Sequence, residues 1–346
     1  MKKFLPLLLL CASLKAQTIY WAGGEDIDFP NGPGTACTYV GSNVRSGYAR
    51  TVVLSCNASY ARSLAFTPAI TSVWLHAQST NCSDQALGLG KSGTGNSLLF
   101  GVGINCNAVI GTYDGSTWTG LATTGNNIIP NGITQFDMQI SNYGASCVVN
   151  LYMNGAGSPL LTYSGNCTVG GNTSLDTVFL SGYFTSGGYF SNEGYSEIIV
   201  SSTDSRALGL VTLAPNANGT TQSWSTPAYT NINPVSINDA NFASDNTNND
   251  VTQYKMNCLP SGTFSIKDVR IVTRGVEVSG GLTHINSGFY NGSSDQLGTA
   301  AVQGLSFTSF LNDFTINPFT SSAWQQSDIG CSSSSTVLQL ELKSGT

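Results

Sequence analysis

Two groups of acidic residues have a spacing that could do chemistry. The first is Glu25, Asp26 and Asp28 in the segment EDID, and the second is Glu193 with Glu197 in EGYSE. Two carboxylates on one side of a strand can act as acid and nucleophile in glycoside hydrolysis, and residues four apart on a strand share a side. EDID has no glutamate after it, however, and isolated surface acids are the simpler explanation of both groups. We therefore predict a protein that is not an enzyme.

The acidic loop could also hold a metal ion. Carboxylates in a glycine-flanked loop supply the hard oxygen ligands that calcium prefers, so Glu25, Asp26 and Asp28 are candidate calcium ligands. A solvated turn explains the same residues, and we favour it by roughly two to one because one segment does not complete a coordination sphere. The only histidines are His76 and His284, and no Cys/His spacing indicates zinc. Calcium is thus the only cofactor that the sequence suggests.

Aromatic residues in loop-like segments are the candidates for glycan binding, because an aromatic ring packs against the apolar face of a sugar. We select Trp118 in YDGSTWTG, together with Tyr183 and Tyr189 in a glycine-rich stretch. Packing in a core is the more frequent fate of such side chains. If they are exposed, they predict a surface that binds polysaccharide.

The composition excludes several classes of partner. Of the 346 residues only 9% are charged, and the 13 Lys and Arg are scattered singly in a chain of net charge −6. Without a basic face, binding to the phosphates of nucleic acid is not expected. No run after the first fifteen residues approaches the roughly 18 apolar residues of a membrane span. The abundance of Gly, Ser, Thr and Asn instead indicates short strands joined by many turns.

Residues 1–16 have the three parts of a secretory signal. Lys2 and Lys3 precede the apolar run FLPLLLLCASL, and Ala16 before Gln17 is a plausible cleavage site. The alternative is an uncleaved apolar tail on a cytosolic protein. The prediction is a signal-like leader and an exported chain.

The cysteines agree with export. Nine are present, and eight, an even number, remain without Cys11. Six of them lie in pairs placed symmetrically about glycine-containing turns, and cysteines at such positions fall opposite one another on adjacent strands. The last two form the fourth pair. The predicted disulfides are Cys37–Cys56, Cys82–Cys106, Cys147–Cys167 and Cys258–Cys331. Eight reduced cysteines of a cytosolic protein are the alternative.

Alternating apolar residues without a helical period predict strands along the whole chain, separated by Gly, Asn and Ser clusters. The central segment YSEIIVSSTDSRALGLVTLAP divides these strands into two groups. The strand YSEIIV is the last of the first group, and a polar hinge SSTDSR follows it. Residues 208–214 are the first strand of the next sheet, and Pro215 ends that strand. In YSEIIV, Ile198 and Val200 should share one face, with Glu197 and Ile199 on the other.

These patterns predict an all-β fold with two antiparallel, jelly-roll-like β-sandwich domains in tandem. The leader is residues 1–16, the first domain residues 17–202 and the second domain residues 207–346. FSIKDVRIVTRGVEV and the final VLQLELKS are the clearest strands of the second domain, and the polar stretch 238–253 is expected to be an exposed loop.

The succession VWLHAQ, FDMQISN, VVNLYMNG, LDTVFLSGYF and YFSNEGYSEIIV resembles the concanavalin A-like, laminin-G-like jelly roll over residues 18–202. WAGGEDIDF, RSGYAR, SEIIVSSTDSRALGLVTLAPNANGTTQSW, NINPVSINDANF and INPFTSSAWQQSDI, in this order, resemble a two-domain group of bacteriophage virion proteins. The resemblance implies a lectin-like first domain, a β-rich second domain, and other virion proteins or copies of the chain itself as partners.

Three hypotheses follow for the function. The first is a non-enzymatic phage virion component that displays a lectin-like domain, located in the virion and able to bind surface glycans. The second is a secreted bacterial glycan-binding or adhesive protein, which the leader and the paired cysteines favour. The third is a secreted glycosidase, although the acidic residues do not reproduce the E-x-D-x-x-E arrangement of lectin-fold glucanases.

Overall fold

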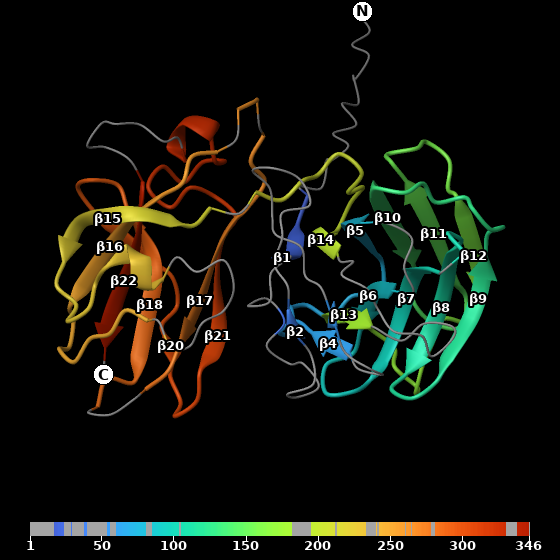
Figure 1. Cartoon of the computed structure of the whole chain (residues 1–346), viewed down its shortest axis with the longest axis horizontal. Coiled ribbons are helices and arrows are strands. Elements are labelled where there is room, and N and C mark those ends of the chain that lie inside the picture. The colour runs from blue at the N-terminus through green and yellow to red at the C-terminus, as the bar shows by residue number, and fades with distance from the viewer. Residues whose placement is uncertain are drawn as a thin grey trace, which may run out of the picture.

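The computed structural model describes residues 17–23, 29, 38–39, 54–55, 60–80, 85–103, 105–181, 195–211, 213–232, 240, 242–259, 261–263, 265–277, 281–329 and 338–345. Regular structure in these ranges is β-strand, apart from the short 3-10 helices η2 (Tyr229–Asn231) and η3 (Gln326–Asp328). The strands form antiparallel sheets in two lobes, an N-terminal and a C-terminal one (Figure 1). The predicted all-β class is confirmed.

The N-terminal lobe consists of two six-stranded antiparallel sheets. The front sheet has the order β1-β14-β5-β10-β11-β12, and the back sheet has the order β4-β13-β6-β7-β8-β9. The front strands are β1 (Ile19–Gly23), β14 (Tyr195–Ser201), β5 (Val73–Thr80), β10 (Ile133–Ser141), β11 (Cys147–Met153) and β12 (Leu161–Gly165). The back strands are β4 (Tyr60–Arg62), β13 (Thr177–Ser181), β6 (Gln85–Gly90), β7 (Asn96–Val102), β8 (Ala108–Asp114) and β9 (Trp118–Thr123). The short strands β2 (Thr38–Tyr39) and β3 (Leu54–Ser55) pair with each other.

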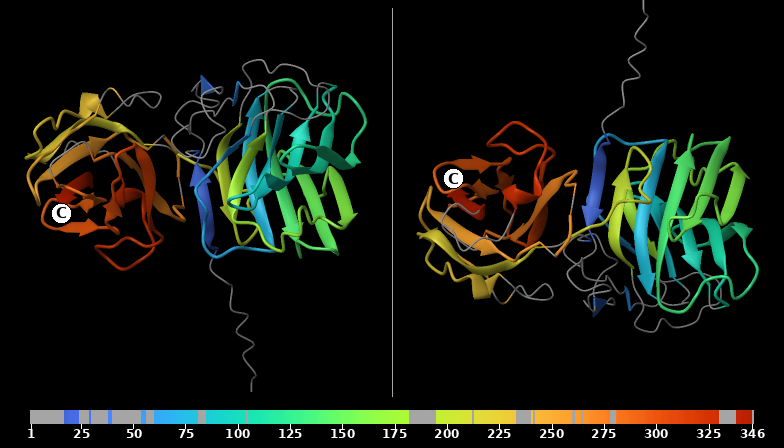
Figure 2. Two further views of the ribbon diagram at one scale, coloured as in Figure 1. Left: turned by 90° about the horizontal axis from the view of Figure 1, so that it is seen from below. Right: turned by 90° about the horizontal axis from the view of Figure 1, so that it is seen from above.

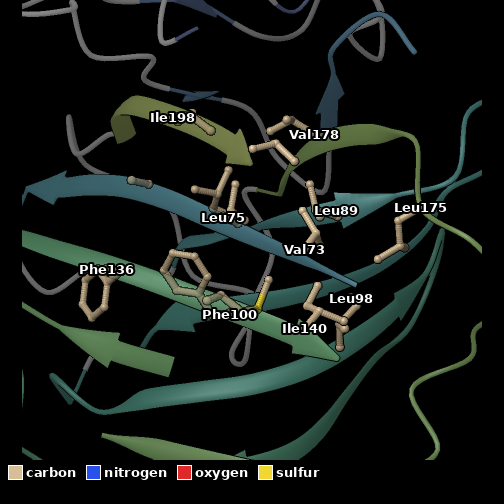
Figure 3. Close-up of a cluster of buried hydrophobic side chains, with 14 of the residues drawn as sticks. Val73, Leu75, Leu89, Leu98, Phe100, Phe136, Ile140, Leu175, Val178 and Ile198 are labelled. Atoms are coloured by element: carbon tan, nitrogen blue, oxygen red, sulfur yellow. The ribbon is translucent and has the colours of Figure 1, made fainter. Parts of the chain in front are cut away.

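The main core lies between the two sheets, and the alternation of each front strand decides which side chains enter it. In β10, Phe136, Met138 and Ile140 are buried in this core, so the residues between them project from the outer face. Side chains from β5, β7, β10, β13 and β14 meet there (Figure 3). Ile198 and Val200 of β14 belong to the core while Ile199 does not, which confirms the predicted faces of these three residues.

One disulfide closes the β11–β12 hairpin. Cys147, the first residue of β11, bonds to Cys167, with a Cα–Cα distance of 5.9 Å, and both residues are buried. This pairing was predicted from the symmetry of the hairpin. Cys106 and Cys258 are also disulfide-bonded, and their predicted partners Cys82 and Cys331 lie outside the described residues, as do both members of the predicted pair Cys37–Cys56. The Cys147–Cys167 bond, which joins residues 20 apart in sequence, stabilises the fold by about 3 kcal/mol in the chain-entropy account.

The C-terminal lobe is built on a third sheet with the order β15-β16-β22-β18-β19, in which β20 also pairs with β18. A separate pair, β17 with β21, lies beside it (Figure 1). The strands are β15 (Pro215–Gln222), β16 (Val251–Met256), β17 (Val269–Gly275), β18 (His284–Tyr290), β19 (Asp295–Leu297), β20 (Ala301–Val302), β21 (Thr308–Phe314) and β22 (Gln339–Gly345).

Tryptophans anchor two small cores in this lobe. Trp224 packs with Tyr254 and Leu342, and Trp324 packs with Ile271 and Phe289. The indole nitrogen of Trp324 donates a hydrogen bond of 2.6 Å to the carbonyl of Phe314 at the end of β21. The tryptophan of the segment INPFTSSAWQQSDI is therefore a core residue, with its polar atom satisfied as burial requires.

Two expectations about the second half of the chain were wrong. Residues 208–211 and 213–214 are not in a strand, and Pro215 begins β15 instead of ending a strand. Proline is tolerated there because it is the first residue of an edge strand. Residues 251–253, placed in the polar loop 238–253 by their composition, instead belong to β16. Hydrogen bonds to the neighbouring strands therefore place residues 251–253 in the sheet despite their polar side chains.

Arg270 of β17 connects the two lobes. Its Nη1 donates to the carbonyl of Ala22 at 3.1 Å and its Nη2 to that of Tyr20 at 3.5 Å, both in the edge strand β1. The guanidinium also forms a bidentate ion pair with Asp313 of β21. β1 lies on the side of the N-terminal lobe that faces this strand pair (Figure 1). The contact satisfies carbonyls that an open edge strand would otherwise present to another chain. The domain boundaries themselves stay a prediction.

Asp268, two residues before Arg270, makes the stability of the fold depend on pH. Burial, and secondly the charge of Asp313, raise the pKa of Asp268 to about 6, and its Oδ1 is shielded without a hydrogen-bond partner. Because the folded state holds this proton more tightly than the unfolded state, the stabilisation is present below about pH 4 and is lost as the pH rises through 6.

We expect Asp268→Asn to remove a contribution of at most about 3 kcal/mol to this pH dependence. Urea unfolding between pH 4 and 7 measures the difference between the wild type and the variant. Asp114→Asn is the control: hydrogen bonds from Thr117 and Ser116 lower the pKa of Asp114 below 3.8, so this carboxylate is ionised in both states above about pH 5 and its removal should leave the slope there unchanged. Parallel pH profiles for the wild type and Asp268→Asn would contradict the assignment.

Candidate functional site

The outer face of the front sheet carries a row of uncharged polar side chains. Gln139 of β10 is directly opposite Asn150 of β11, and Asn150 is directly opposite Thr162 of β12. Neighbouring strands are about 4.8 Å apart, so the three side chains span about 10 Å across the sheet. Figure 2 (right) shows β10 and β11 side by side on this face. We call these three residues the amide row.

The amide row is held by its own hydrogen bonds. Asn150 Nδ2 donates to Gln139 Oε1 at 3.1 Å, and Thr162 Oγ1 donates to Asn150 Oδ1 at 2.9 Å. Gln139 and Asn150 are half-buried and Thr162 is exposed, so the row becomes more accessible toward the edge strand β12. Each amide still has hydrogen-bonding capacity left for a ligand, since an amide group offers two N–H donors and two lone pairs.

An aromatic pair borders the amide row. The rings of Trp74 in β5 and Tyr152 in β11 are stacked across β10, with centroids 5.4 Å apart. The guanidinium of Arg206 lies over both, 5.5 Å from the Trp74 ring and 4.8 Å from the Tyr152 ring. Tyr152 also contacts the row, because its hydroxyl donates to Gln139 Oε1 at 3.4 Å. The pair is thus part of the same surface.

A buried carboxylate fixes the segment that carries Arg206. Asp137 of β10 accepts hydrogen bonds on Oδ1 from His76 Nδ1 at 2.9 Å and from Ser205 Oγ at 2.7 Å. Its Oδ2 accepts one from Gln135 Nε2 at 2.8 Å, and Gln135 Nε2 also donates to the carbonyl of Arg206. His76, Asp137 and Ser205 are all fully buried. Three donors compensate for the lost hydration of the charge.

The predicted polar hinge is therefore not a free linker. Ser201 and Ser205 are buried, and Ser201 is the last residue of β14. Ser202 and Thr18 exchange two hydrogen bonds, from each backbone N–H to an oxygen of the other residue. The hydroxyls of Ser202 and Ser205 thus bind Thr18 and Asp137, whereas the sequence predicted a polar hinge between two sheets.

The grouping of Ser205, His76 and Asp137 is not a nucleophilic triad. The serine hydroxyl donates to the carboxylate instead of to the imidazole, so histidine cannot take its proton. His76 Nε2, which would face a nucleophile in such a triad, is buried without a hydrogen-bond partner. The three residues hold the fold of this face together.

The structure places two of the residues selected from the sequence. Trp118 lies in β9, not in a loop, and its ring packs over Gly111 and beside a cluster of buried residues on the outer face of the back sheet. Glu197 is fully buried in β14, at a bulge where its φ is 50°. The amide row and Trp118 are thus on opposite sheets.

The remaining predicted site residues lie outside the described residues. These are the candidate calcium ligands Glu25, Asp26 and Asp28, the acid Glu193, and the aromatic residues Tyr183 and Tyr189. Among the side chains that the structure describes, no three His, Cys, Asp or Glu come together as a metal site. The described ranges also contain no helix of the length and apolarity needed to cross a bilayer.

Comparison with known proteins finds partial likenesses among solved structures. No family model and no curated protein matches the chain. Among solved structures, the carbohydrate-binding module CBM66 from Bacillus subtilis is 9% identical, with a TM-score of 0.33 over 53% of this chain and 93% of that one. The CBM2 module of the evolved Dit of Lactobacillus casei BL23 phage J-1 is 13% identical, with a TM-score of 0.29 over 56% and 93%. Alginate lyase vAL-1 from a Chlorella virus is 9% identical, with a TM-score of 0.34 over 48% and 90%.

Removing the buried carboxylate tests the role of Asp137. We expect Asp137→Ala to lower the free energy of unfolding by about 3 to 5 kcal/mol, since it leaves the three donors without their acceptor in a buried site. Asp204→Ala is the control on the same segment. The Asp204 side chain is 47% exposed, and loss of its ion pair should cost no more than about 1 kcal/mol. Denaturant unfolding of both variants measures this, and equal small losses would refute the role given to Asp137.

Proposed function

We propose that the chain is a non-enzymatic protein that binds glycans on the outer face of its front sheet. The amide row is the observation that carries this proposal. Sugars present hydroxyl groups that both donate and accept hydrogen bonds, and Gln139, Asn150 and Thr162 offer both functions at fixed spacing. The adjacent Trp74 ring, which is half-buried, can supply the apolar contact that the carbon face of a sugar ring needs, whereas Tyr152 is buried beneath Arg206.

The carboxylates in and beside the front sheet support binding without hydrolysis. Asp137 is buried under three hydrogen-bond donors, Glu197 is buried within β14, and Asp204 is ion-paired to Arg206. Hydrolysis by a carboxylate pair needs one protonated and one ionised group flanking the same bond in an accessible site. None of these three groups is placed for that role, so recognition is the chemistry that this face supports.

Binding at such a row is expected to be weak for a single copy. A few neutral hydrogen bonds contribute only about 1 kcal/mol each, after the loss of their hydrogen bonds to water. Useful attachment would come from many copies on one particle or fibre, where linkage raises the effective concentration of each site. A repeated display of the chain therefore fits the proposed function.

The phage virion role is the finer form of this proposal. The segments that resemble virion proteins support it, because they occur in the same order along the chain, from WAGGEDIDF to INPFTSSAWQQSDI. A particle would supply the repeated display that weak sites need. A secreted bacterial adhesive protein is the second candidate, favoured by the Cys147–Cys167 disulfide, because such bonds persist in oxidising compartments.

Substitutions in the amide row test glycan binding. We expect Asn150→Ala to weaken binding of the multimerised chain on a glycan array, by roughly fivefold for each hydrogen bond lost per site. Asn107→Ala is the matched control, because Asn107 Nδ2 donates to Thr123 Oγ1 at 3.0 Å in an equivalent pair near the back sheet. Equal effects of the two substitutions would place the ligand elsewhere. Reducing sugar released from a bound glycan would overturn the non-enzymatic assignment.

Mass spectrometry separates the two candidate roles. If the chain is a virion protein, its peptides should co-purify with particles through density-gradient centrifugation in a constant ratio to the major capsid protein. If it is a secreted adhesive protein, they should instead appear in the culture supernatant of cells that release no particles. The virion role fails if the peptides are absent from purified particles.

A further inference from the structure

An ion pair stands at the border of the amide row. Arg206 Nε donates to both carboxylate oxygens of Asp204, at 2.9 Å and 3.0 Å, and Nη2 donates to Asp204 Oδ2 at 2.5 Å. The Arg206 side chain is 26% exposed and that of Asp204 is 47% exposed, so both remain accessible from solution. The backbone between them is fixed by the buried hydrogen bond from Ser205 to Asp137.

The ion pair leaves part of the guanidinium free. Of the five N–H groups of an arginine, Nε–H and one on Nη2 bind Asp204, and one on Nη1 donates to the carbonyl of Ala156 at 2.7 Å. Two N–H groups remain on Arg206. Because Trp74 and Tyr152 hold the guanidinium plane, these donors have a fixed place beside the aromatic pair.

The charge of this border is balanced. The amide row itself has no ionisable group, and Asp204 already provides the bidentate carboxylate partner that the guanidinium geometry favours. A ligand carboxylate that accepted from the two remaining N–H groups would lie beside the negative charge of Asp204, which repels it and already neutralises Arg206. The hydroxyl of a neutral sugar could instead accept from the remaining N–H groups without disturbing the pair. The net charge of −6 further disfavours polyanions.

We infer that Asp204 determines specificity: by neutralising Arg206 it makes the site favour neutral over acidic glycans. The inference rests on the proposed function, because it concerns the ligand of the same surface. Asp204 acts as an internal stand-in for a ligand carboxylate, and Arg206 contributes hydrogen-bond donors instead of an uncompensated charge. Binding of the wild-type chain should accordingly change little with salt, since no charged contact to the ligand is screened.

A glycan array of neutral and uronate-containing polysaccharides tests this specificity. The multimerised wild type should bind neutral glycans more tightly than uronate-containing ones, and Asp204→Asn should strengthen binding to the uronate-containing ones by about fivefold, the value of one exposed ion pair. Asp114→Asn is the matched control, because it removes the same charge from an exposed turn of the back sheet. Salt-sensitive binding of wild type to uronates, or an equal gain in both variants, would overturn the inference.

A second measurement separates this inference from the proposed function. The NMR signal of the Arg206 Nε–H is followed while sodium glucuronate is added to the full chain. It should not move in wild type and should move in Asp204→Asn. Movement in wild type, or none in the variant, refutes the role of Asp204 whether or not any polysaccharide binds. An array without any bound glycan would instead refute the proposed function.

Discussion

The outer face of the front sheet depends on a buried carboxylate, that of Asp137. Asp137 accepts hydrogen bonds from β5, from its own strand and from the segment after β14, so one carboxylate joins parts of the chain that are far apart in sequence. A buried carboxylate without donors would be strongly unfavourable, whereas three donors make removal of any partner costly. The segment 201–206 is consequently held against the sheet, and Arg206 takes a defined place over Trp74 and Tyr152.

Much of the fold follows from alternation of apolar residues. The strands FDMQIS and VVNLYM put every second residue into the core, and their polar residues alternate with these, so the outward positions of Gln139 and Asn150 were present in the sequence. Hairpin symmetry similarly predicted the Cys147–Cys167 bond. Local patterns suffice where the partner strand is the next one in the chain.

The candidate site was missed because it requires long-range register. Trp74 meets Gln139 and Tyr152 only after β5 pairs with β10, across about sixty residues, and no local pattern sets that pairing. Polarity also misled in the segment 201–206, where Ser205 is polar because it binds a buried carboxylate. Trp118 was selected because its segment YDGSTWTG has the composition of a loop, but it begins β9 and its ring lies over Gly111, where a Cβ would lie 2.2 Å from it.

The small number of charged groups on the outer face of the front sheet suits the proposed binding of sugars. A sheet face that binds hydroxyl groups works best with side chains that both donate and accept, and a formal charge would add a desolvation cost without adding a matching partner. The two ionised groups of Asp204 and Arg206 are therefore tolerated at the border because they neutralise each other and are partly exposed. Asp137 is tolerated beneath it because it is fully hydrogen-bonded. The surface left between them is polar and uncharged, and that combination favours a ligand that carries hydroxyl groups and no charge.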